Sequence, residues 1–283
     1  MKLPFKIDLS ERNCVVTGGA GVLCSTFSKA LAQCGANVII LDVAAEKAAE
    51  VAKTIKENGG KAKAIKTDIL DEKSLLNAKK EIIREYGIPD ILINGAGGNH
   101  PKGTTTNEFF ERKDLQKEEV KTFFDLEREG IEFVFNLNFL GTFLTTQIFA
   151  EDMTKKDDAV IINISSMNSF TPLTKIPAYS AAKAAISNFT EWLAVHFSRE
   201  NLRVNALAPG FFLTEQNKEL LLDEEGNYTE RAEKIISQTP LERFGEKEEL
   251  IGTLLWLVGN NSAGFVNGNV VPIDGGFSAY SGV

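Results

Sequence analysis

Tyr179 and Lys183 stand four residues apart in Tyr-Ser-Ala-Ala-Lys, within a stretch that is typical of one helix from Pro177 to about Ser198. Residues at this spacing lie on the same helix face, one turn apart, so an ammonium group is expected beside a phenol. A free phenol has a pKa of about 10, and a nearby cation favours the phenolate and lowers that pKa. The pair therefore suits proton transfer to or from a substrate.

Alone, such a pair is more often an ordinary helix face, but a hydroxyl group precedes it. Ser166 ends the apolar run Val160–Ser166, which is typical of a buried parallel strand. In an open α/β sheet, ligands bind at the carboxyl ends of such strands. Ser166 is therefore the predicted partner of the Tyr–Lys pair, and the connecting segment 167–177 is expected to line the same site.

The composition describes an acidic globular protein. The 283 residues carry a net charge of −8, which argues against nucleic-acid binding through a basic face. No apolar run approaches the roughly 18 residues needed to span a bilayer, and the first residues, 1–6, lack the apolar region of a signal peptide. Cys14, Cys24 and Cys34 lack metal-binding spacing and are expected to be reduced core residues, so we predict a cytoplasmic protein.

Strand-like and helix-like stretches alternate from the start of the chain. Strands are expected at 13–17, 38–42, 63–68, 90–94, 160–166, 203–208 and 269–274, and helices after the first turn to about 34, at 45–58, 71–86, 177–198 and 247–257. This order predicts an α/β fold with a doubly wound, mostly parallel sheet and helices on both faces. With no linker or repeat visible, we expect residues 1–283 to form one domain.

A glycine-rich turn follows the first expected strand, in Thr17-Gly-Gly-Ala-Gly-Val-Leu-Cys24. Glycines let the backbone approach a pyrophosphate, whose charge is stabilised by the N-terminus of the following helix. Between a strand and a helix, this pattern is strong evidence for a dinucleotide site. The candidate contacts in this turn are Thr17, Gly18, Gly19, Gly21, Val22 and Leu23.

Asp42 ends the second expected strand, 24 residues after Gly18. A carboxylate there accepts hydrogen bonds from the ribose hydroxyls of NAD and repels the 2′-phosphate of NADP. No Lys or Arg occurs between Thr17 and Ser28, or between Asp42 and Lys47. We therefore predict NAD as the cofactor. The alternative is that Asp42 only caps the next helix.

These features resemble the short-chain dehydrogenase/reductase family over nearly the whole chain. The family's catalytic Ser and its Y-x-x-x-K helix match Ser166, Tyr179 and Lys183, and its fourth catalytic position matches Asn138 in Asn-Phe-Leu-Gly141. The resemblance implies a Rossmann-like fold of about seven strands, a homodimer or homotetramer, and hydride transfer between NAD and a secondary alcohol or ketone. Tyr179 would be the acid/base, Lys183 would lower its pKa and hold the nicotinamide ribose, Ser166 would bind the carbonyl oxygen, and Asn138 would support a water relay.

The same resemblance extends the cofactor site. A Thr-Asp-Ile segment at 67–69 matches the adenine-contacting position, 94–97 match the N-A-G turn, and 209–214 match the P-G-x-x-x-T segment at the nicotinamide. The contacts that it implies are Asp68, Ile69, Asn94, Gly95, Ala96, Tyr179, Lys183, Pro209, Gly210, Phe212 and Thr214. One departure is that two glycines of the family's usual T-G-x-x-x-G-x-G turn are replaced here by Val22 and Cys24.

Several stretches are similar to the D-mannonate oxidoreductase (fructuronate reductase) branch of the family. They are residues 17–24, 94–102, 163–168, 209–217 and 275–283. This likeness implies interconversion of D-mannonate and D-fructuronate. The alternatives are another sugar-acid or polyol dehydrogenase, for example one acting on gluconate; a 3-oxoacyl reductase, which Asp42 disfavours; and a non-catalytic NAD-binding sensor, which the filled catalytic positions disfavour.

Two variable regions are expected beside the substrate, a loop insertion near 98–130 and a flap near 211–240. The densely charged run 111–121 of the insertion is expected to be a solvated helical excursion. An acidic protein repels anions at long range, so a sugar acid needs cations at the site itself. Each candidate could instead be an ordinary solvated or core side chain. The candidates are Asn99, His100, Lys102, Asn168, Lys175, Phe211 and Arg243.

Replacing Asp42 tests the cofactor prediction. Asp42→Ala should lower the ratio of kcat/KM for NAD to that for NADP by about tenfold, because it removes a charged hydrogen-bond acceptor and the repulsion of the 2′-phosphate. Both cofactors are compared with one substrate at one pH. A wild-type protein that prefers NADP would contradict the prediction.

Overall fold

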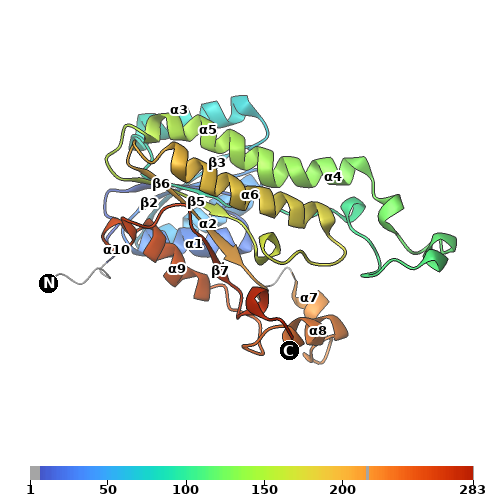
Figure 1. Cartoon of the computed structure of the whole chain (residues 1–283). Helices are drawn as coiled ribbons and strands as arrows, with labels where there is room; N and C mark the ends of the chain where they lie inside the picture. The colour runs from blue at the N-terminus through green and yellow to red at the C-terminus, as the bar shows by residue number, and fades with distance from the viewer. Residues whose placement is uncertain (1–6, 215–216, 283) are drawn as a thin grey trace.

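The computed structural model describes residues 7–214 and 217–282 as a layered α/β fold (Figure 1). Seven strands form one sheet in the order β3-β2-β1-β4-β5-β6-β7, and every neighbouring pair is parallel. The predicted doubly wound sheet of about seven strands is confirmed. The strands are β1 (Asn13–Thr17), β2 (Asn37–Asp42), β3 (Lys61–Lys66), β4 (Ile91–Asn94), β5 (Ala159–Ile164), β6 (Leu202–Pro209) and β7 (Val270–Ile273).

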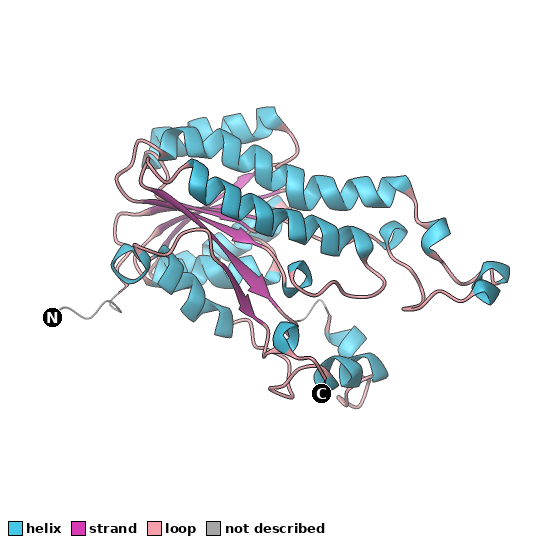
Figure 2. Cartoon of the chain, viewed as in Figure 1, coloured by secondary structure: helices cyan, strands magenta, loops and turns pink. Residues whose placement is uncertain are grey.

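Helices cover both faces of this sheet (Figure 2). Helices α1, α2 and α9 pack on one face, and α3, α5 and α6 pack on the other. Four short helices complete the described set. The helices are α1 (Val22–Gln33), α2 (Ala45–Glu57), α3 (Glu72–Tyr86), α4 (Arg128–Phe135), α5 (Gly141–Met153), α6 (Pro177–His196), α7 (Lys218–Leu221), α8 (Glu230–Ser237), α9 (Glu249–Val258) and α10 (Asn260–Ala263).

The central strands are apolar because both of their faces are covered. Every residue of β1, β4, β5 and β6 is buried. Successive side chains alternate between faces: Cys14 and Val16 join the core beside α1, whereas Val15 joins the core beside α3 and α5. The strand order reverses between β1 and β4, so the ligand crevice is expected where these two strands end.

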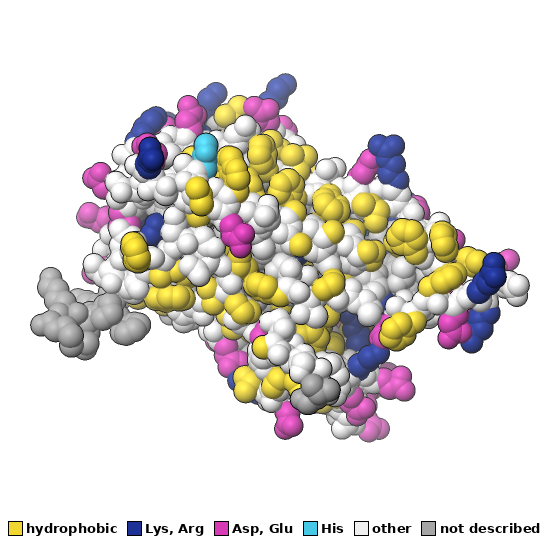
Figure 3. All heavy atoms as spheres, in the orientation of Figure 1, with side chains coloured by type: hydrophobic (Ala, Val, Ile, Leu, Met, Phe, Trp, Pro, Cys, Tyr) yellow, Lys and Arg dark blue, Asp and Glu magenta, His cyan; other side chains and the backbone are white. Residues whose placement is uncertain are grey.

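The predicted insertion is an arm that projects from the body beyond α4 (Figure 1). Residues 104–126 of this arm contain two short 3₁₀ helices, η2 (Arg112–Gln116) and η3 (Phe123–Asp125). Its charged side chains are mostly exposed, as expected for a solvated excursion. The arm also exposes phenylalanines, and Figure 3 shows yellow hydrophobic side chains on the projecting end of the molecule. The exposed phenylalanines are Phe109, Phe110, Phe123 and Phe124.

The predicted flap contains α7 and α8, and two of its residues, 215–216, lie outside the described residues. Residues 279–282 of the tail are exposed in the single chain, and Val283 also lies outside the description. The third predicted strand is displaced: β3 spans 61–66 rather than 63–68, so Asp68 follows the strand in a turn.

One helix differs from the sequence expectation about membrane spans. The continuous helical stretch Arg128–Met153 has a mean hydropathy of 1.3 over 18 residues, which is enough by length and composition to cross a bilayer. Half of that window is buried inside the protein. The stretch packs against α3, α6 and β4 and buries Asn138, Thr142 and Thr145. Packing within the fold therefore accounts for its apolar composition.

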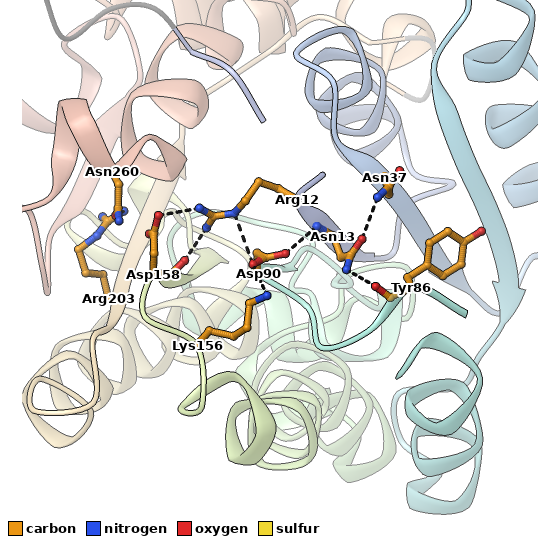
Figure 4. A network of polar contacts seen from close by, with 9 residues as sticks. All are labelled: Arg12, Asn13, Asn37, Tyr86, Asp90, Lys156, Asp158, Arg203 and Asn260. Atoms are coloured by element: carbon orange, nitrogen blue, oxygen red, sulfur yellow. Dashed lines mark hydrogen bonds and ion pairs between the residues drawn. The ribbon is translucent and has the colours of Figure 1, made fainter. Parts of the chain in front are cut away.

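A polar network ties the strands together at the edge opposite their carboxyl ends (Figure 4). The buried Asp90 carboxylate accepts a hydrogen bond of 2.8 Å from the backbone N–H of Asn13 and lies 2.8 Å from Lys156 Nζ and 3.6 Å from Arg12 Nε. Arg12 also contacts Asp158 Oδ2 at 2.6 Å. The network joins the starts of β1, β4 and β5. The charge of Asp90 is stable in this buried position because it is paired.

Removing Asp90 should therefore destabilise the sheet. Asp90→Ala leaves Lys156 and the backbone N–H of Asn13 without their partner and removes one of the two carboxylates at Arg12, so we expect the free energy of unfolding to fall by about 2–3 kcal/mol. Urea denaturation measures the loss. The control is Glu57→Ala, whose pair with Lys53 is exposed and 3.7 Å long, and which should change stability by less than about 0.5 kcal/mol. Equal effects of the two variants would contradict this role of Asp90.

Candidate active site

A cleft of about 610 Å³ lies where the parallel strands end. Its walls come from the turns after β1 and β4 and from the ends of β2, β5 and β6, as expected for an open α/β sheet. Of the residues predicted from the sequence, those that line the cleft are Gly18, Gly21, Val22, Leu23, Asp42, Gly95, Ala96, Ser166, Tyr179, Lys183, Pro209, Gly210, Phe211, Phe212 and Thr214.

The predicted proton-transfer pair lies at one end of this cleft. Pro177 occupies the first turn of α6, where its missing N–H leaves no helical hydrogen bond unmade. Tyr179 and Lys183 follow on one face of α6, with Lys183 Nζ 5.6 Å from the centroid of the Tyr179 ring. Ser166 follows β5 and hydrogen-bonds the Tyr179 hydroxyl. The structure thus brings together the Ser, Tyr and Lys that the sequence separates by 17 residues.

Lys183 is held inside the protein rather than at the surface. Its side chain is only 4% exposed, and Nζ donates a hydrogen bond of 2.8 Å to the carbonyl of Ile164, at the end of β5. Burial lowers the pKa of Lys183 to about 8, against an ordinary value of 10.5. At neutral pH the ammonium form therefore still predominates.

The predicted decrease in the pKa of Tyr179 is wrong for the protein without ligand. Burial of the hydroxyl raises its pKa to about 12, and the hydrogen bond with Ser166 offsets this only in part. The side chain as a whole is half-buried, because one side of it borders the cleft. The sequence argument counted the neighbouring cation but could not weigh it against desolvation, which is the larger effect here.

Asn138 lies one layer behind the cleft, in a π-helical turn that spans Asn136–Leu140 between α4 and α5. Its amide nitrogen donates to the carbonyls of Gly98 and Val134 at 2.7 and 2.8 Å, and its Oδ1 accepts from the N–H of Gly98 at 3.2 Å. A π-turn widens the helix and is frequent at functional sites. Here Asn138 fixes the strand-end loop that lines the cleft.

The glycine-rich turn is shaped for close approach of backbone to backbone. Gly18 has a φ of +62°, in the left-handed region, and a Cβ there would lie 2.7 Å from Ala96 Cα. Thr17 Oγ1 accepts hydrogen bonds from the N–H groups of Gly95 and Ala96 at 3.1 and 3.4 Å. The turns after β1 and β4 therefore form one continuous wall of the cleft.

The departure from the family's glycine pattern has a compensating partner. A Cβ on Gly95 would lie 2.1 Å from the Sγ of Cys24, so the thiol fills space that a side chain at residue 95 would need. The family's usual Asn-Ala-Gly is Asn-Gly-Ala-Gly here. Burial raises the pKa of Cys24 to about 12, so it is a neutral thiol and acts as a small packing residue.

The start of α1 is suited to an anion. Its N-cap, Gly21, makes no side-chain capping bond, and its first turn holds no acidic residue. Free N–H groups at a helix N-terminus bind phosphates.

Asp42 is held at the rim of the cleft by two backbone contacts. Its Oδ2 accepts a hydrogen bond from the N–H of Ala20 at 3.0 Å, and its Oδ1 accepts one from the N–H of Ala44 at 2.9 Å. These contacts fix the carboxylate, and each oxygen retains a lone pair for a ribose hydroxyl. The cleft therefore fits a dinucleotide.

Five of the predicted cofactor residues do not line the cleft. Thr17 and Asn94 are buried behind it, and Asn94 donates at 2.9 Å to both Thr146 Oγ1 and Asn163 Oδ1. Asp68 is exposed after β3 and accepts from the N–H of Leu70. The others are Gly19, packed on Ile40, and Ile69, packed on Gly141. Their contacts position the walls rather than face a ligand.

Two of the predicted substrate cations are already paired. Lys102 Nζ lies 2.5 Å from Glu129 and 3.0 Å from Glu127, and these two carboxylates raise its pKa. Arg243 forms a bidentate pair with Glu249 at 2.7 and 2.8 Å. Neither Lys102 nor Arg243 lines the cleft.

The remaining substrate candidates have mixed positions. Asn99 donates to Thr104 Oγ1 at 3.1 Å, and His100 Nδ1 accepts from the N–H of Lys102 at 3.2 Å, so both stabilise the start of the arm. Phe211 lines the cleft. Asn168 is buried two residues after Ser166, and its Oδ1 has no hydrogen-bond partner among the described residues. Lys175 is half-buried beside the arm.

Sequence reasoning missed several residues that line the cleft. They are Ala20, Cys24, Val43, Ala44, Lys47, Gly98, Leu137, Ile164, Ser165 and Asn217. Most neighbour a predicted residue, so strand-end position alone could have found them. Lys47 matters for the choice between NAD and NADP, because it places a cation at the rim of the cleft. The argument for NAD had considered only the residues between Asp42 and Lys47. Within the described residues, no group of three or more His, Cys, Asp or Glu side chains is placed to hold a metal ion.

Comparison with known proteins gives full-length similarity. The profile of the family described as short chain dehydrogenase matches residues 12–225. An uncharacterized oxidoreductase of Haemophilus influenzae is 57% identical over 283 residues, which covers 100% of this chain and 99% of that protein. An uncharacterized oxidoreductase of Bacillus subtilis, UxuB, is 50% identical over 281 residues, with 99% and 100% coverage.

A solved structure agrees with the whole fold. The crystal structure of a Haemophilus protein, provisionally assigned as a D-mannonate oxidoreductase and solved with bound NAD, is 57% identical and covers 98% of both chains with a TM-score of 0.93.

The lowered pKa of Lys183 predicts a pH dependence of stability. Between pH values of about 8 and 10.5 the unfolded chain binds more protons at this lysine than the folded chain, so the free energy of unfolding rises with pH. Below about pH 8 the contribution is constant and unfavourable. The stability of the wild type should rise relative to Lys183→Met by about 1–3 kcal/mol between pH about 7.5 and 10.

Urea denaturation without cofactor, at constant ionic strength, measures this difference. The matched control is Lys53→Met, because Lys53 is an exposed lysine on α2. A stability gap between wild type and Lys183→Met that stays constant over this pH range would show that burial does not depress the pKa of Lys183.

Proposed function

The chain belongs to the short-chain dehydrogenase family, and from this premise we propose that it is an NAD-dependent oxidoreductase that interconverts D-mannonate and D-fructuronate. The substrate assignment is supported by the full-length identity of 57% to the Haemophilus protein that was solved with NAD and provisionally assigned as a D-mannonate oxidoreductase. The observation that carries the chemistry is the meeting of Ser166, Tyr179 and Lys183 in one cleft.

The proposed cofactor contacts follow from the walls of the cleft. The uncapped start of α1 would hold the pyrophosphate, and Asp42 would accept the ribose hydroxyls at the rim. When bound, NAD accepts a hydride in alcohol oxidation and NADH donates one in ketone reduction. Gly18 packs closely against Ala96, which joins the two turns that would border the ligand. Lys183, Pro209, Phe212 and Thr214 would hold the nicotinamide end.

Tyr179 would transfer the proton at the substrate oxygen. Because its pKa is raised by burial, the phenol keeps its proton at neutral pH and can protonate the alkoxide that forms as a ketone is reduced. Ser166, which already hydrogen-bonds the Tyr179 hydroxyl, would donate a hydrogen bond to the same substrate oxygen as negative charge develops there. In alcohol oxidation Tyr179 would act in reverse, as the base.

Lys183 would support the phenol from inside the protein. Its ammonium group is fixed by the carbonyl of Ile164 and lies 5.6 Å from the centroid of the Tyr179 ring, where it would favour the phenolate. Asn138 would support a relay of protons to Lys183, since both side chains face Gly97, where a Cβ would lie 2.6 Å from Asn138 Oδ1 and 3.3 Å from Lys183 Nζ. A homodimer or homotetramer in the cytoplasm remains a prediction from the sequence.

A substrate panel tests the proposal. NADH oxidation should be measured with D-fructuronate, 5-keto-D-gluconate and a neutral ketose, and NAD reduction with D-mannonate, D-gluconate and a polyol. We expect the highest kcat/KM for the D-mannonate and D-fructuronate pair. Highest efficiency with gluconate would assign another sugar-acid dehydrogenase, and a lack of turnover on all compounds would contradict an enzymatic role.

Tyr179→Phe tests the proposed acid/base. The variant keeps the ring and loses the transferable proton, so kcat should fall by about 10²–10⁴-fold, while NADH binding, measured by fluorescence, should persist. Tyr86→Phe, at the end of α3 and outside the cleft, is the matched control and should retain activity. Near-normal turnover of Tyr179→Phe would exclude the role.

A further inference from the structure

Three chain segments that begin at the cleft meet outside it. The arm follows Gly98, the segment with Lys175 connects Ser166 to Tyr179, and the flap with α8 follows Asn217; the residues at these departure points line the cleft. Figure 1 shows the arm, the loop before α6 and α8 at the same end of the molecule. Glu108, Lys175 and Lys234 do not line the cleft itself, so the meeting point lies outside it, next to the loop that leads to Tyr179.

Specific contacts join the three segments. The backbone N–H of Thr105, in the arm, donates a hydrogen bond of 2.8 Å to the carbonyl of Lys175. Three residues later, the Glu108 carboxylate forms an ion pair with Lys234 of α8. Glu108 is thus placed between the flap and the loop that precedes Tyr179.

Two ammonium groups act on the single Glu108 carboxylate. The hydrogen bond from Lys234 lowers the pKa of Glu108, and the charges of Lys234 and Lys175 lower it further. The Glu108 side chain is 25% exposed, whereas that of Lys234 is 62% exposed. Among residues 7–214 and 217–282, Lys175 forms no ion pair of its own within 4 Å. Figure 3 shows dark blue basic side chains between the arm and the lower part of the molecule.

The backbone at Lys175 supports a functional placement. Its φ of +72° lies in the left-handed region, which non-glycine residues rarely adopt and which recurs at ligand-binding sites. The hydrogen bond from Thr105 holds this conformation. Lys102 and Arg243, the other cations predicted to meet substrate, are paired with glutamates elsewhere.

We propose that Lys175 and Lys234 form the subsite for the substrate carboxylate, and that Glu108 competes with the substrate for the same two ammonium groups. The inference rests on the proposed function, because it requires an anionic substrate. A sugar acid can replace Glu108 between the lysines, whereas a neutral sugar gains nothing from doing so. The subsite thereby offsets, at one point, the repulsion of anions by a chain of net charge −8.

The test compares single variants with D-fructuronate and NADH. Glu108→Gln should lower KM for D-fructuronate by about fivefold, because one negative charge near the bound anion is removed. Lys175→Gln and Lys234→Gln should each raise that KM by about tenfold. KM for NADH should stay constant in all three variants and serves as the internal control.

Matched controls separate a local from a general charge effect. Glu132→Gln and Arg128→Gln change the net charge by the same amounts, and these two residues form an exposed ion pair with each other on α4, 2.6 Å apart. Both variants should keep the wild-type KM for D-fructuronate. A control that shifts KM as much as its test variant would overturn the proposed subsite.

Each remaining outcome also decides the inference. A higher KM in Glu108→Gln would make Glu108 a support of binding rather than a competitor. Unchanged KM in both lysine variants, with active wild type, would remove the subsite and leave the proposed function standing. Wild-type protein that turns over no sugar acid in the substrate panel would remove both.

Discussion

The site depends on a buried chain of hydrogen bonds that fixes the position of α6, the helix bearing the reactive groups, along the central strands. Asn94 ends β4 opposite Asn163 of β5 and donates to it, and Asn163 donates in turn to Thr190 of α6 at 2.9 Å. Buried amides are stable only when they are paired, so α6 cannot slide along the sheet without breaking these bonds. Tyr179 and Lys183 inherit their position from this constraint.

Desolvation then sets the chemistry of the groups so positioned. Lys183 is buried against the end of β5, which destabilises its charged form, and the same environment destabilises a Tyr179 phenolate. In the protein without ligand the pair consists of a neutral phenol and an ammonium group with a lowered pKa. That state suits proton donation to a forming alkoxide. Burial, rather than the neighbouring cation, is the main determinant of the pKa of Tyr179.

The outer segments differ from this rigid centre because their charges are paired at the surface. The arm contributes Glu108 to a contact with the flap, and its base contributes the pair of Lys102 with Glu129. Exposed ion pairs contribute little to stability but determine which cations remain accessible to an anion. The arm thus pairs Lys102 and Lys234, two of the cations at this end of the molecule.

The order of strands and helices, the dinucleotide turn and the Tyr–Lys pair were determined by the sequence alone, because periodicity, turn chemistry and helix spacing are local properties. Asp42 could be placed at the rim for the same reason, since strand ends share one edge of a parallel sheet. The tertiary structure decided what depends on distant partners. Glu108 and Lys234 are 126 residues apart, and the pKa of Tyr179 depends on how completely the fold excludes water. Neither pairing nor burial is encoded by spacing along the chain.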